Sequence, residues 1–190
     1  MDFYGFGKSK AERPLTLYDY ADAIQEIIDA YGMKEVVLVG HSFGGRVAIL
    51  LASRLKNVKG IVLVDSAGMK PKNTLKKSMR KLKYKLRKAF GLSTSMCGSE
   101  DYRALDEVMK VTFKNVVNLY LEDLLPKIGC PALLIWGKRD KDTPLYMAKR
   151  MKRGIKDCGL IILEGGHFSY LDDYATFLAV LESYFKDICN

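Results

Sequence analysis

The chain has 190 residues, 48% of them hydrophobic, and its 31 Lys and Arg against 22 Asp and Glu give a formal charge of +9. That length suits one domain, and a content of 28% charged and 11% aromatic residues excludes disordered and collagen-like chains. No run approaches the ~20 apolar residues of a membrane-spanning helix, and residues 1–10 lack the apolar stretch of a signal peptide. The four cysteines are scattered without a C-x-x-C pair, so we expect a reducing cytoplasm, with neither structural disulfides nor a zinc site.

The excess of positive over negative charge lies in one segment, residues 70–88. This segment holds ten Lys and Arg and no acidic residue, which leaves 21 basic and 22 acidic residues in the rest of the chain. The basic balance is therefore a local property, and we do not expect a nucleic-acid partner.

The first predicted element is a helix that begins at about residue 17. Its apolar side chains recur at helical spacing, at Leu17, Ala21, Ile24, Ile28 and Tyr31. Thr16, followed three residues later by Asp19, resembles a capping box, which favours a helix start at this point.

Four short apolar runs follow along the chain, at residues 36–39, 61–64, 132–136 and 160–163. They are continuous rather than alternating, as expected of strands that are buried on both faces of a parallel sheet. Helical patterns lie between or after them, at residues 43–55, from Thr143-Pro144 to Gly154, and at residues 174–188. This alternation predicts an α/β fold with a mainly parallel sheet and right-handed crossovers.

Residues 70–128 interrupt the alternation and read as a helical insertion. The first helix of this segment has an apolar face made of Leu75, Met79, Leu82, Leu86 and Phe90, with basic residues around it. Such a helix is typical of contact with a membrane surface or a polyanion. We favour the alternative, a helix that covers a substrate cleft with its apolar face and leaves its lysines in water.

The segment Gly40-His41-Ser42-Phe43-Gly44 fits the pattern G-x-S-x-G, directly after one apolar run and before an apolar helix. A sharp strand-to-helix turn of this kind holds its central serine in a strained conformation, with the hydroxyl exposed as a nucleophile. The Phe43 N–H at the start of the helix would point at a developing oxyanion. The alternative is a glycine-rich phosphate-binding turn, although neither G-K-[ST] nor G-x-G-x-x-G accompanies it.

A serine nucleophile needs a base, and the chain has only two histidines. His41 adjoins Ser42 at a tight turn where neighbouring side chains point apart, so we interpret it as structural. His167 follows the run 160–163 and should lie at the carboxyl edge of the sheet, where ligands bind in open α/β folds. The alternative for His167 is a solvated loop residue.

The base in turn needs a carboxylate to fix its tautomer. Asp140 is the first candidate, because it follows the run 132–136 within a short loop. Asp142, two residues away, and Asp65, directly after the run 61–64, are alternatives.

Four segments together resemble the α/β-hydrolase fold superfamily, in its serine-nucleophile branch. They are VVLVGHSFGG, ALLIWGKRDKDTP, LEGGHFSYL and the opening DFYGFGKS, which is similar to the family loop D-x-x-G-x-G-x-S at Asp2, Gly5, Gly7 and Ser9. The resemblance implies a triad of Ser42, Asp140 and His167. It also implies a core of residues 1–69 and 129–190 with a cap of residues 70–128 over the active site. Serine at the elbow argues against the dehalogenases and epoxide hydrolases of this superfamily, which place aspartate there.

The chain departs from the family pattern at its beginning. In the family the D-x-x-G-x-G-x-S loop follows several strands, one of which leads into an H-G loop that donates the second oxyanion-hole N–H. Here Asp2 opens the loop and no H-G motif precedes it. We therefore expect the last four strands of the family sheet, with residues 36–39 as an exposed edge that can pair with another chain.

These observations predict a serine hydrolase that cleaves a small ester, thioester or related acyl substrate through an acyl-enzyme intermediate. The expected partner is a small-molecule substrate, and no metal or organic cofactor is implied. The alternative is a truncated or split hydrolase, inactive alone, that acts through chain pairing, for example as a homo-oligomer joined at the sheet edge.

Overall fold

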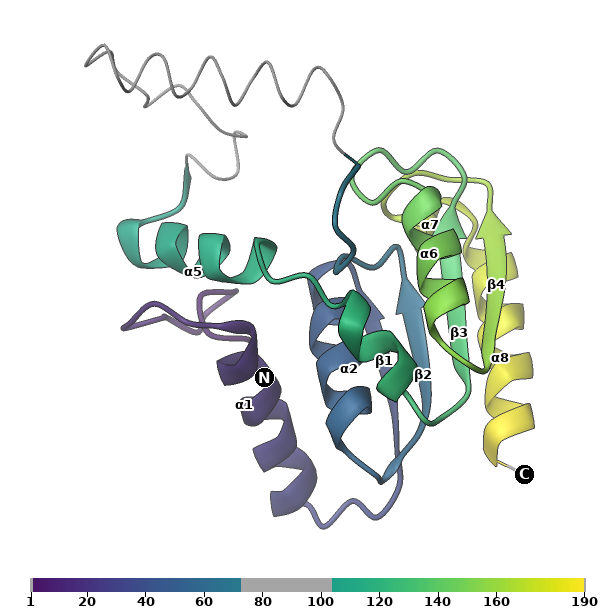
Figure 1. Cartoon of the computed structure of the whole chain (residues 1–190), viewed down its shortest axis with the longest axis horizontal. Coiled ribbons are helices and arrows are strands. Elements are labelled where there is room, and N and C mark those ends of the chain that lie inside the picture. The colour runs from purple at the N-terminus through teal and green to yellow at the C-terminus, as the bar shows by residue number, and fades with distance from the viewer. Residues whose placement is uncertain (1, 73–103, 190) are drawn as a thin grey trace. The chain divides into compact units, whose positions relative to one another are not determined.

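The computed structural model describes residues 2–72 and 104–189 (Figure 1). The chain divides into two compact units, Met1–Leu15 with Pro71–Val116 and Thr16–Lys70 with Val117–Asn190, and each is described by itself. The predicted basic helix of residues 75–90 lies outside the described residues. The predicted division into a core of residues 1–69 and 129–190 and a cap of residues 70–128 stays a prediction.

The second unit is built on a parallel sheet of four strands in the order β1-β2-β3-β4. The strands are β1 (Val36–His41), β2 (Val58–Val64), β3 (Ala132–Gly137) and β4 (Cys158–Leu163). Each contains one of the four predicted apolar runs, so the predicted strands are confirmed, with each strand longer than its run by one or more residues. Because all four strands run parallel, their carboxyl ends lie at one edge of the sheet (Figure 1).

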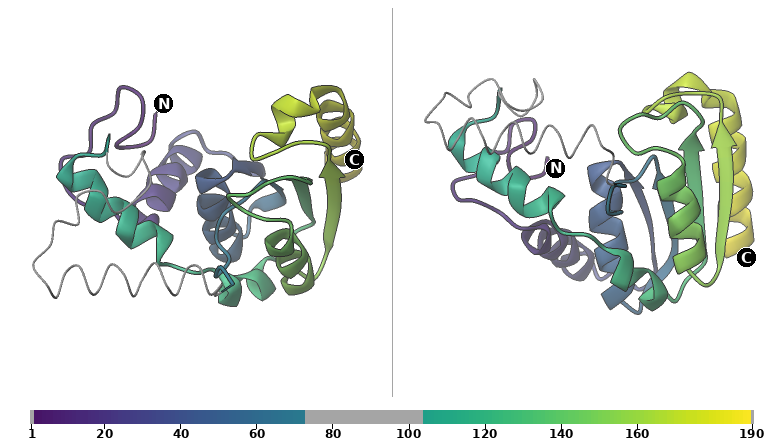
Figure 2. Two further views of the ribbon diagram at one scale, coloured as in Figure 1. Left: turned by 90° about the horizontal axis from the view of Figure 1, so that it is seen from above. Right: turned by 45° about the horizontal axis from the view of Figure 1, so that its top comes forward.

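Helices cover both faces of this sheet (Figure 2). One face carries α2 (Phe43–Arg54) and α6 (Tyr146–Gly154), and the other carries the short α7 (Ser169–Asp172) and α8 (Tyr174–Cys189). Outside the sheet layer, α1 (Leu17–Ala30) packs on α2, and the 3-10 helix η1 (Glu122–Lys127) packs on α2 and α6. The predicted helices at residues 17, 43–55 and 174–188 are thereby confirmed.

The predicted start of α1 is confirmed and its predicted last apolar residue is not. Thr16 and Asp19 form a reciprocal capping box: Thr16 N–H donates to Asp19 Oδ2 at 2.7 Å, and Asp19 N–H donates to Thr16 Oγ1 at 3.4 Å. Leu17, Ala21 and Ile28 are buried, but Tyr31 is 78% exposed. The helix ends at Ala30, so Tyr31 leaves the helical face on which the pattern placed it.

The centre of the sheet is buried on both faces and its edges are not. Val62, Val64, Leu133, Ile135 and Leu163 form a buried cluster against α8. In the edge strands, by contrast, Val39 is 52% exposed and Ile162 is 45% exposed. The prediction that all four runs are buried on both faces was therefore wrong for β1 and β4. The exposed edge that we expected at residues 36–39 is confirmed.

In the first unit, the loop of residues 2–9 closes on itself. Asp2 Oδ2 accepts the Lys8 N–H at 2.9 Å, and the Gly5 N–H donates to the Ser9 carbonyl at 2.8 Å. Gly5 and Gly7 have φ of +82° and +53°, which side chains disfavour. In the same unit, Thr112 of α5 (Glu107–Val117) accepts the Leu15 N–H at 2.9 Å.

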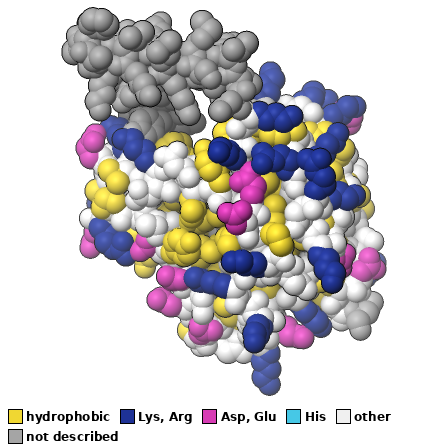
Figure 3. All heavy atoms as spheres, viewed as in Figure 1, with side chains coloured by type: hydrophobic (Ala, Val, Ile, Leu, Met, Phe, Trp, Pro, Cys, Tyr) yellow, Lys and Arg dark blue, Asp and Glu magenta, His cyan; other side chains and the backbone are white. Residues whose placement is uncertain are grey.

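On the face drawn in Figure 3, Lys and Arg side chains gather over α6. The sequence of this helix, YMAKRMKRG, carries four basic residues and no acidic one. The positive charge is therefore not confined to residues 70–88, although the rest of the chain is nearly neutral overall. Within the part of the chain that the structure describes, no helix has both the length and the apolar character needed to cross a membrane.

Candidate active site

Ser42 lies at the turn between β1 and α2, at the carboxyl edge of the sheet. Its φ of +49° and ψ of −110° are a strained combination for a residue with a side chain. The end of β2 holds this conformation: the Ser42 N–H donates to the Val64 carbonyl at 3.0 Å, and the Ala67 N–H donates to the Ser42 carbonyl at 3.0 Å. The turn therefore presents the Ser42 hydroxyl in a fixed orientation.

The glycines around Ser42 differ in how strictly the turn needs them. A Cβ at Gly40 would lie 2.6 Å from the Gly44 backbone, and one at Gly45 would lie 2.6 Å from the Ser66 Cβ, closer than van der Waals contact allows. A Cβ at Gly44 would meet no heavy atom of the described residues within 4 Å. Close approach of the backbone thus requires glycine at positions 40 and 45, but not at position 44.

His167 lies in the loop between β4 and α7, and its imidazole reaches the serine. Nε2 is 2.9 Å from the Ser42 Oγ, a hydrogen-bond distance. The imidazole is only 15% exposed, so most of the ring is held in the protein while one nitrogen meets the serine. The two side chains are 125 positions apart in the chain and are brought together by the ends of β1 and β4.

Asp140, in the loop after β3, is the third member of a chain of contacts from Ser42 through His167 to Asp140, which we call the relay. Its Oδ2 lies 2.9 Å from the His167 Nδ1, and its side chain is fully buried. Three further donors, the N–H groups of Asp142 and Thr143 and the Thr143 hydroxyl, lie 2.6–2.9 Å from its oxygens. Burial by itself raises the pKa of the Asp140 carboxyl, but the hydrogen bonds from His167 and Thr143 lower it by more, and the net pKa is below the ordinary value.

The two alternative acids have other partners. Asp142 contributes its backbone N–H to Asp140 Oδ1, and the residue is exposed. The Asp65 carboxylate accepts hydrogen bonds from Gly137 and Ser169. Of the three candidates that the sequence left open, Asp140 is the one whose carboxylate is bonded to the His167 ring.

His41, which we interpreted as structural, contacts the loop of the base. Its Nε2 lies 2.7 Å from the His167 carbonyl oxygen. Its ring packs against Phe168 and Tyr170, with centroids 5.3 and 5.1 Å away. His41 thus links the end of β1 to the main chain of residue 167.

Phe43, the predicted oxyanion-hole donor, is the first residue of α2. Its backbone N–H therefore lies at a helix N-terminus, where the helix dipole favours negative charge. Its ring packs edge-to-face on Tyr20, with centroids 5.0 Å apart and an interplanar angle of 82°.

Sequence reasoning missed the part that Thr143 plays. We took Thr143-Pro144 as the start of a helix, but α6 begins at Tyr146, with Leu145 as its N-cap. Thr143 is instead buried beside Asp140, and its hydroxyl lies 2.6 Å from Oδ2. A hydroxyl residue three positions after a candidate acid was the available signal.

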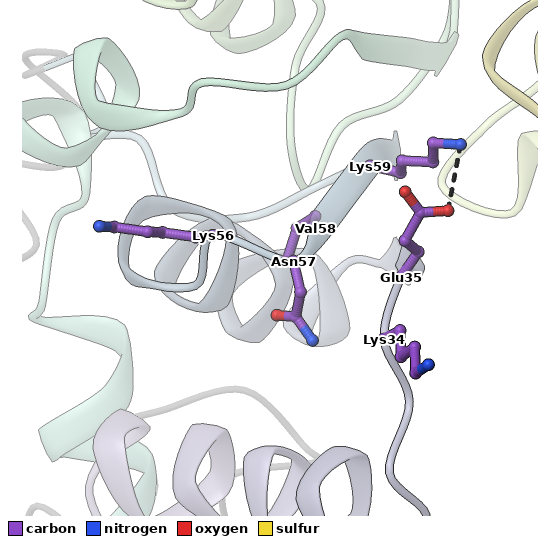
Figure 4. A pocket seen from close by; sticks show the side chains of 6 residues that line it. All are labelled: Lys34, Glu35, Lys56, Asn57, Val58 and Lys59. Atoms are coloured by element: carbon purple, nitrogen blue, oxygen red, sulfur yellow. Dashed lines mark ion pairs between the residues drawn. The ribbon is translucent and has the colours of Figure 1, made fainter.

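Other features of the described residues do not add to this site. Oxygen and nitrogen atoms of Asp140, Asp142 and His167 lie within 4.8 Å of one another, as metal ligands would, but Asp140 and His167 are already hydrogen-bonded to each other. A hollow of about 310 Å³ is lined by Lys34, Glu35 and residues 56–59, with Lys59 paired to Glu35 at 3.1 Å (Figure 4). It lies at the amino ends of β1 and β2, the opposite edge of the sheet from Ser42.

Comparison with known proteins identifies the family to which the chain belongs. A model of the alpha/beta hydrolase family matches residues 1–180. The chain belongs to the alpha/beta hydrolase family. It is 27% identical, over 208 aligned positions, to the AB hydrolase superfamily protein YisY of Bacillus subtilis, a match that covers 91% of this chain and 75% of that protein.

Further relatives agree with this assignment. A 2-hydroxy-6-oxononadienedioate/2-hydroxy-6-oxononatrienedioate hydrolase of a Pseudomonas species is 25% identical over 179 positions, covering 79% of this chain and 62% of that protein. Among solved structures, an esterase from Exiguobacterium antarcticum superposes with a TM-score of 0.74 at 24% identity, covering 97% of this chain and 80% of that one. The predicted α/β-hydrolase fold class is confirmed, and the chain is a hydrolase of this superfamily.

Proposed function

We propose that this alpha/beta hydrolase cleaves a small ester, thioester or related acyl substrate through an acyl-enzyme intermediate on Ser42. The observation that supports the proposal is the continuous relay of two 2.9 Å contacts, from Ser42 Oγ to His167 Nε2 and from His167 Nδ1 to Asp140 Oδ2. This is the arrangement that converts a weakly nucleophilic hydroxyl into an acyl acceptor.

In the first half of the reaction, the Ser42 oxygen attacks the substrate carbonyl carbon while its proton passes to His167 Nε2. Asp140, whose lowered pKa keeps it ionised well below neutral pH, stabilises the imidazolium through Nδ1. The Phe43 N–H donates to the oxyanion. The bond from the carbonyl carbon to the leaving oxygen or sulfur then breaks, and His167 returns its proton to that atom.

In the second half, water attacks the acyl group on Ser42 and gives its proton to His167 Nε2. The bond between the carbonyl carbon and the Ser42 oxygen breaks, and the proton returns to that oxygen. The carboxylic acid leaves and the free serine is restored. No redox step or external co-reactant other than water enters the cycle.

The experiment that tests the mechanism is pre-steady-state hydrolysis of p-nitrophenyl acetate. We expect a burst of nitrophenol followed by slower turnover, and mass spectrometry of the quenched protein should find one acetyl group on Ser42. Ser42→Ala should abolish both, whereas Ser53→Ala, a serine of α2 that bonds the Leu50 carbonyl, should leave both unchanged. An acetyl group on another residue in the wild type would overturn the assignment of Ser42.

A second candidate function is pairing with another chain through β1. The exposure of Val39 supports this function. β1 is the end strand of the described sheet, and Val39 on it is 52% exposed. An open, apolar edge strand is a template for pairing with a second copy. Light scattering tests this: pairing predicts a dimer in the wild type and a monomer in Val39→Lys, and a monomeric wild type would rule it out. Contacts of residues 70–88 with a membrane or polyanion stay predictions.

A further inference from the structure

Asp65 is a buried carboxylate next to the relay that the proposed mechanism does not use. It directly follows β2, is 0% exposed, and has a φ of +43°, a conformation that only Asp65 and Ser42 share among the described non-glycine residues. Its backbone N–H donates to the Ile135 carbonyl of β3 at 3.0 Å. A buried acid in a strained conformation lowers the stability of the fold unless its contacts compensate for that cost.

The Asp65 carboxylate joins two loops that carry relay residues. Oδ1 accepts the Gly137 N–H at 2.7 Å, at the end of β3, three residues before Asp140. Oδ2 accepts the Ser169 N–H at 3.1 Å and the Ser169 hydroxyl at 2.6 Å, at the start of α7, two residues after His167. The ends of β2 and β3 and the start of α7 lie together at the carboxyl edge of the sheet (Figure 1).

Through these contacts the Asp65 carboxylate is an anchor that holds the two loops together. All three donors point at an acid, so each hydrogen bond is charge-assisted when the carboxylate is ionised. Ser169 is itself 0% exposed, so neither end of the contact is weakened by water. Burial raises the pKa of the Asp65 carboxyl, and the bonds from Gly137 and Ser169 oppose that rise.

The remaining contacts of the His167 loop show how little freedom its main chain has. The Arg139 N–H donates to the Gly165 carbonyl at 2.8 Å, and the Gly166 N–H donates to Asp172 Oδ2 at 2.8 Å. The His167 carbonyl contacts His41, as described above. Asp65 is the partner that fixes the loop on the far side of His167, where α7 begins.

We propose that Asp65 is a positioning residue for His167: by holding Ser169 and Gly137 together, it sets the distance at which the imidazole meets Ser42. The inference rests on the proposed function of Ser42 and His167. It goes beyond that function because it assigns the efficiency of the relay to a carboxylate that touches neither the substrate nor the imidazole.

Asp65→Asn tests the inference with little change of shape. An amide offers one oxygen in place of two and turns an NH2 group toward one of the donors, so either the Gly137 or the Ser169 contact is lost. Because a misplacement of ~1 Å can cost about 100-fold in rate, we expect kcat to fall about 10- to 100-fold with KM nearly unchanged. Asp157→Asn, at an exposed residue before β4, makes the same charge change away from the relay and should keep the wild-type kcat.

A second readout does not depend on hydrolysis. NMR of the imidazole nitrogens and of the amides of residues 166–169 should show His167 changed in Asp65→Asn, with melting still cooperative. If the wild type shows no hydrolase activity, the proposed function fails while this spectrum still tests the anchor.

Ser169→Ala keeps the backbone contact and removes only the hydroxyl contact, so it should change kcat in the same direction by a smaller factor. This variant carries the test if Asp65→Asn does not fold. A folded Asp65→Asn with wild-type kcat and unchanged His167 resonances would overturn the inference, as would a folded Ser169→Ala with wild-type kcat.

Discussion

The Thr143 hydroxyl lies 2.6 Å from Oδ2 of Asp140, the same oxygen that faces the His167 ring. The Thr143 N–H donates to the other oxygen, Oδ1, at 2.9 Å. The hydroxyl is also 2.9 Å from the Asp65 carbonyl oxygen, so its single proton has two acceptors within reach. Thr143 thus supports the carboxylate that orients the imidazole, and it connects that carboxylate to the end of β2.

Thr143→Val should weaken both the relay and the fold. Valine has a similar volume but no hydroxyl, and a hydrogen bond to a charged group contributes about 1.5–3 kcal/mol to stability. We expect the free energy of unfolding in urea to fall by about that amount. We also expect kcat for a nitrophenyl ester to fall roughly tenfold, because the carboxylate that orients the imidazole loses one of its hydrogen bonds, and about 1.36 kcal/mol of activation free energy is a factor of ten. Thr143→Ser, which keeps the hydroxyl, should retain most of both. A Thr143→Val variant with wild-type stability and kcat would contradict the part assigned to the hydroxyl.

The two glycines of the serine turn should respond in opposite ways to alanine. Gly40→Ala places a Cβ 2.6 Å from the Gly44 backbone, which cannot move without displacing Ser42, so we expect loss of activity and a lower melting temperature. In Gly44→Ala the new Cβ meets no heavy atom of the described residues within 4 Å. The variant should leave the fold unchanged or more stable by up to ~1 kcal/mol, the helix preference of alanine over glycine. Thermal melts and ester turnover measure both. Tolerance of Gly40→Ala would contradict the close packing at the turn.

The lowered pKa of Asp140 predicts a particular dependence of stability on pH. The folded state holds this carboxyl ionised more strongly than the unfolded chain does, so its contribution is complete above the unfolded pKa of about 4 and is lost as the pH falls through the lower folded pKa. Asp140→Asn should therefore flatten the fall in unfolding free energy below about pH 4. Urea titrations at a series of pH values measure this slope, and an unchanged slope in the variant would be the contrary result.

Salt should affect the contributions of Asp140 and the exposed Glu164 to the pH dependence of stability differently. Hydrogen bonds and ion pairs with Lys138 and Arg139, at 2.7 and 2.9 Å, also lower the pKa of Glu164, but the side chain of Glu164 is 61% exposed. Salt at about 1 M shortens the screening length to about 3 Å, so it should weaken the Glu164 contribution to the acid slope more than that of buried Asp140. The difference between Glu164→Gln and the wild type should then shrink in high salt, whereas that between Asp140→Asn and the wild type should persist.

The sequence was sufficient to bring the relay residues together. Ser42, Asp140 and His167 each follow a different apolar run, and parallel strands bring such positions to one edge regardless of loop detail. The capping box of Thr16 and Asp19 was readable for a similar reason, since it depends on a local spacing.

Features that depend on loop conformation or on neighbours in the sheet could not be read in this way. Asp65 and Asp140 both follow apolar runs, so the pattern does not distinguish them. In the structure Asp65 has a φ of +43° and contacts Gly137 and Ser169, not His167. The four-residue α7 is too short to show a helical period. The exposure of Ile162 follows from the place of β4 at the sheet edge, which is a property of the strand order and not of the run itself.

Reaction of the purified protein with a fluorophosphonate probe, read by mass spectrometry, tests the central claim most directly. The probe reacts with a serine only when a base activates it, so it reports the relay without knowledge of the substrate. We predict a single labelled site at Ser42, no label in Ser42→Ala, and a strongly slowed reaction in His167→Ala. A folded wild-type protein that takes up no label, or that is labelled equally well without His167, would contradict the account.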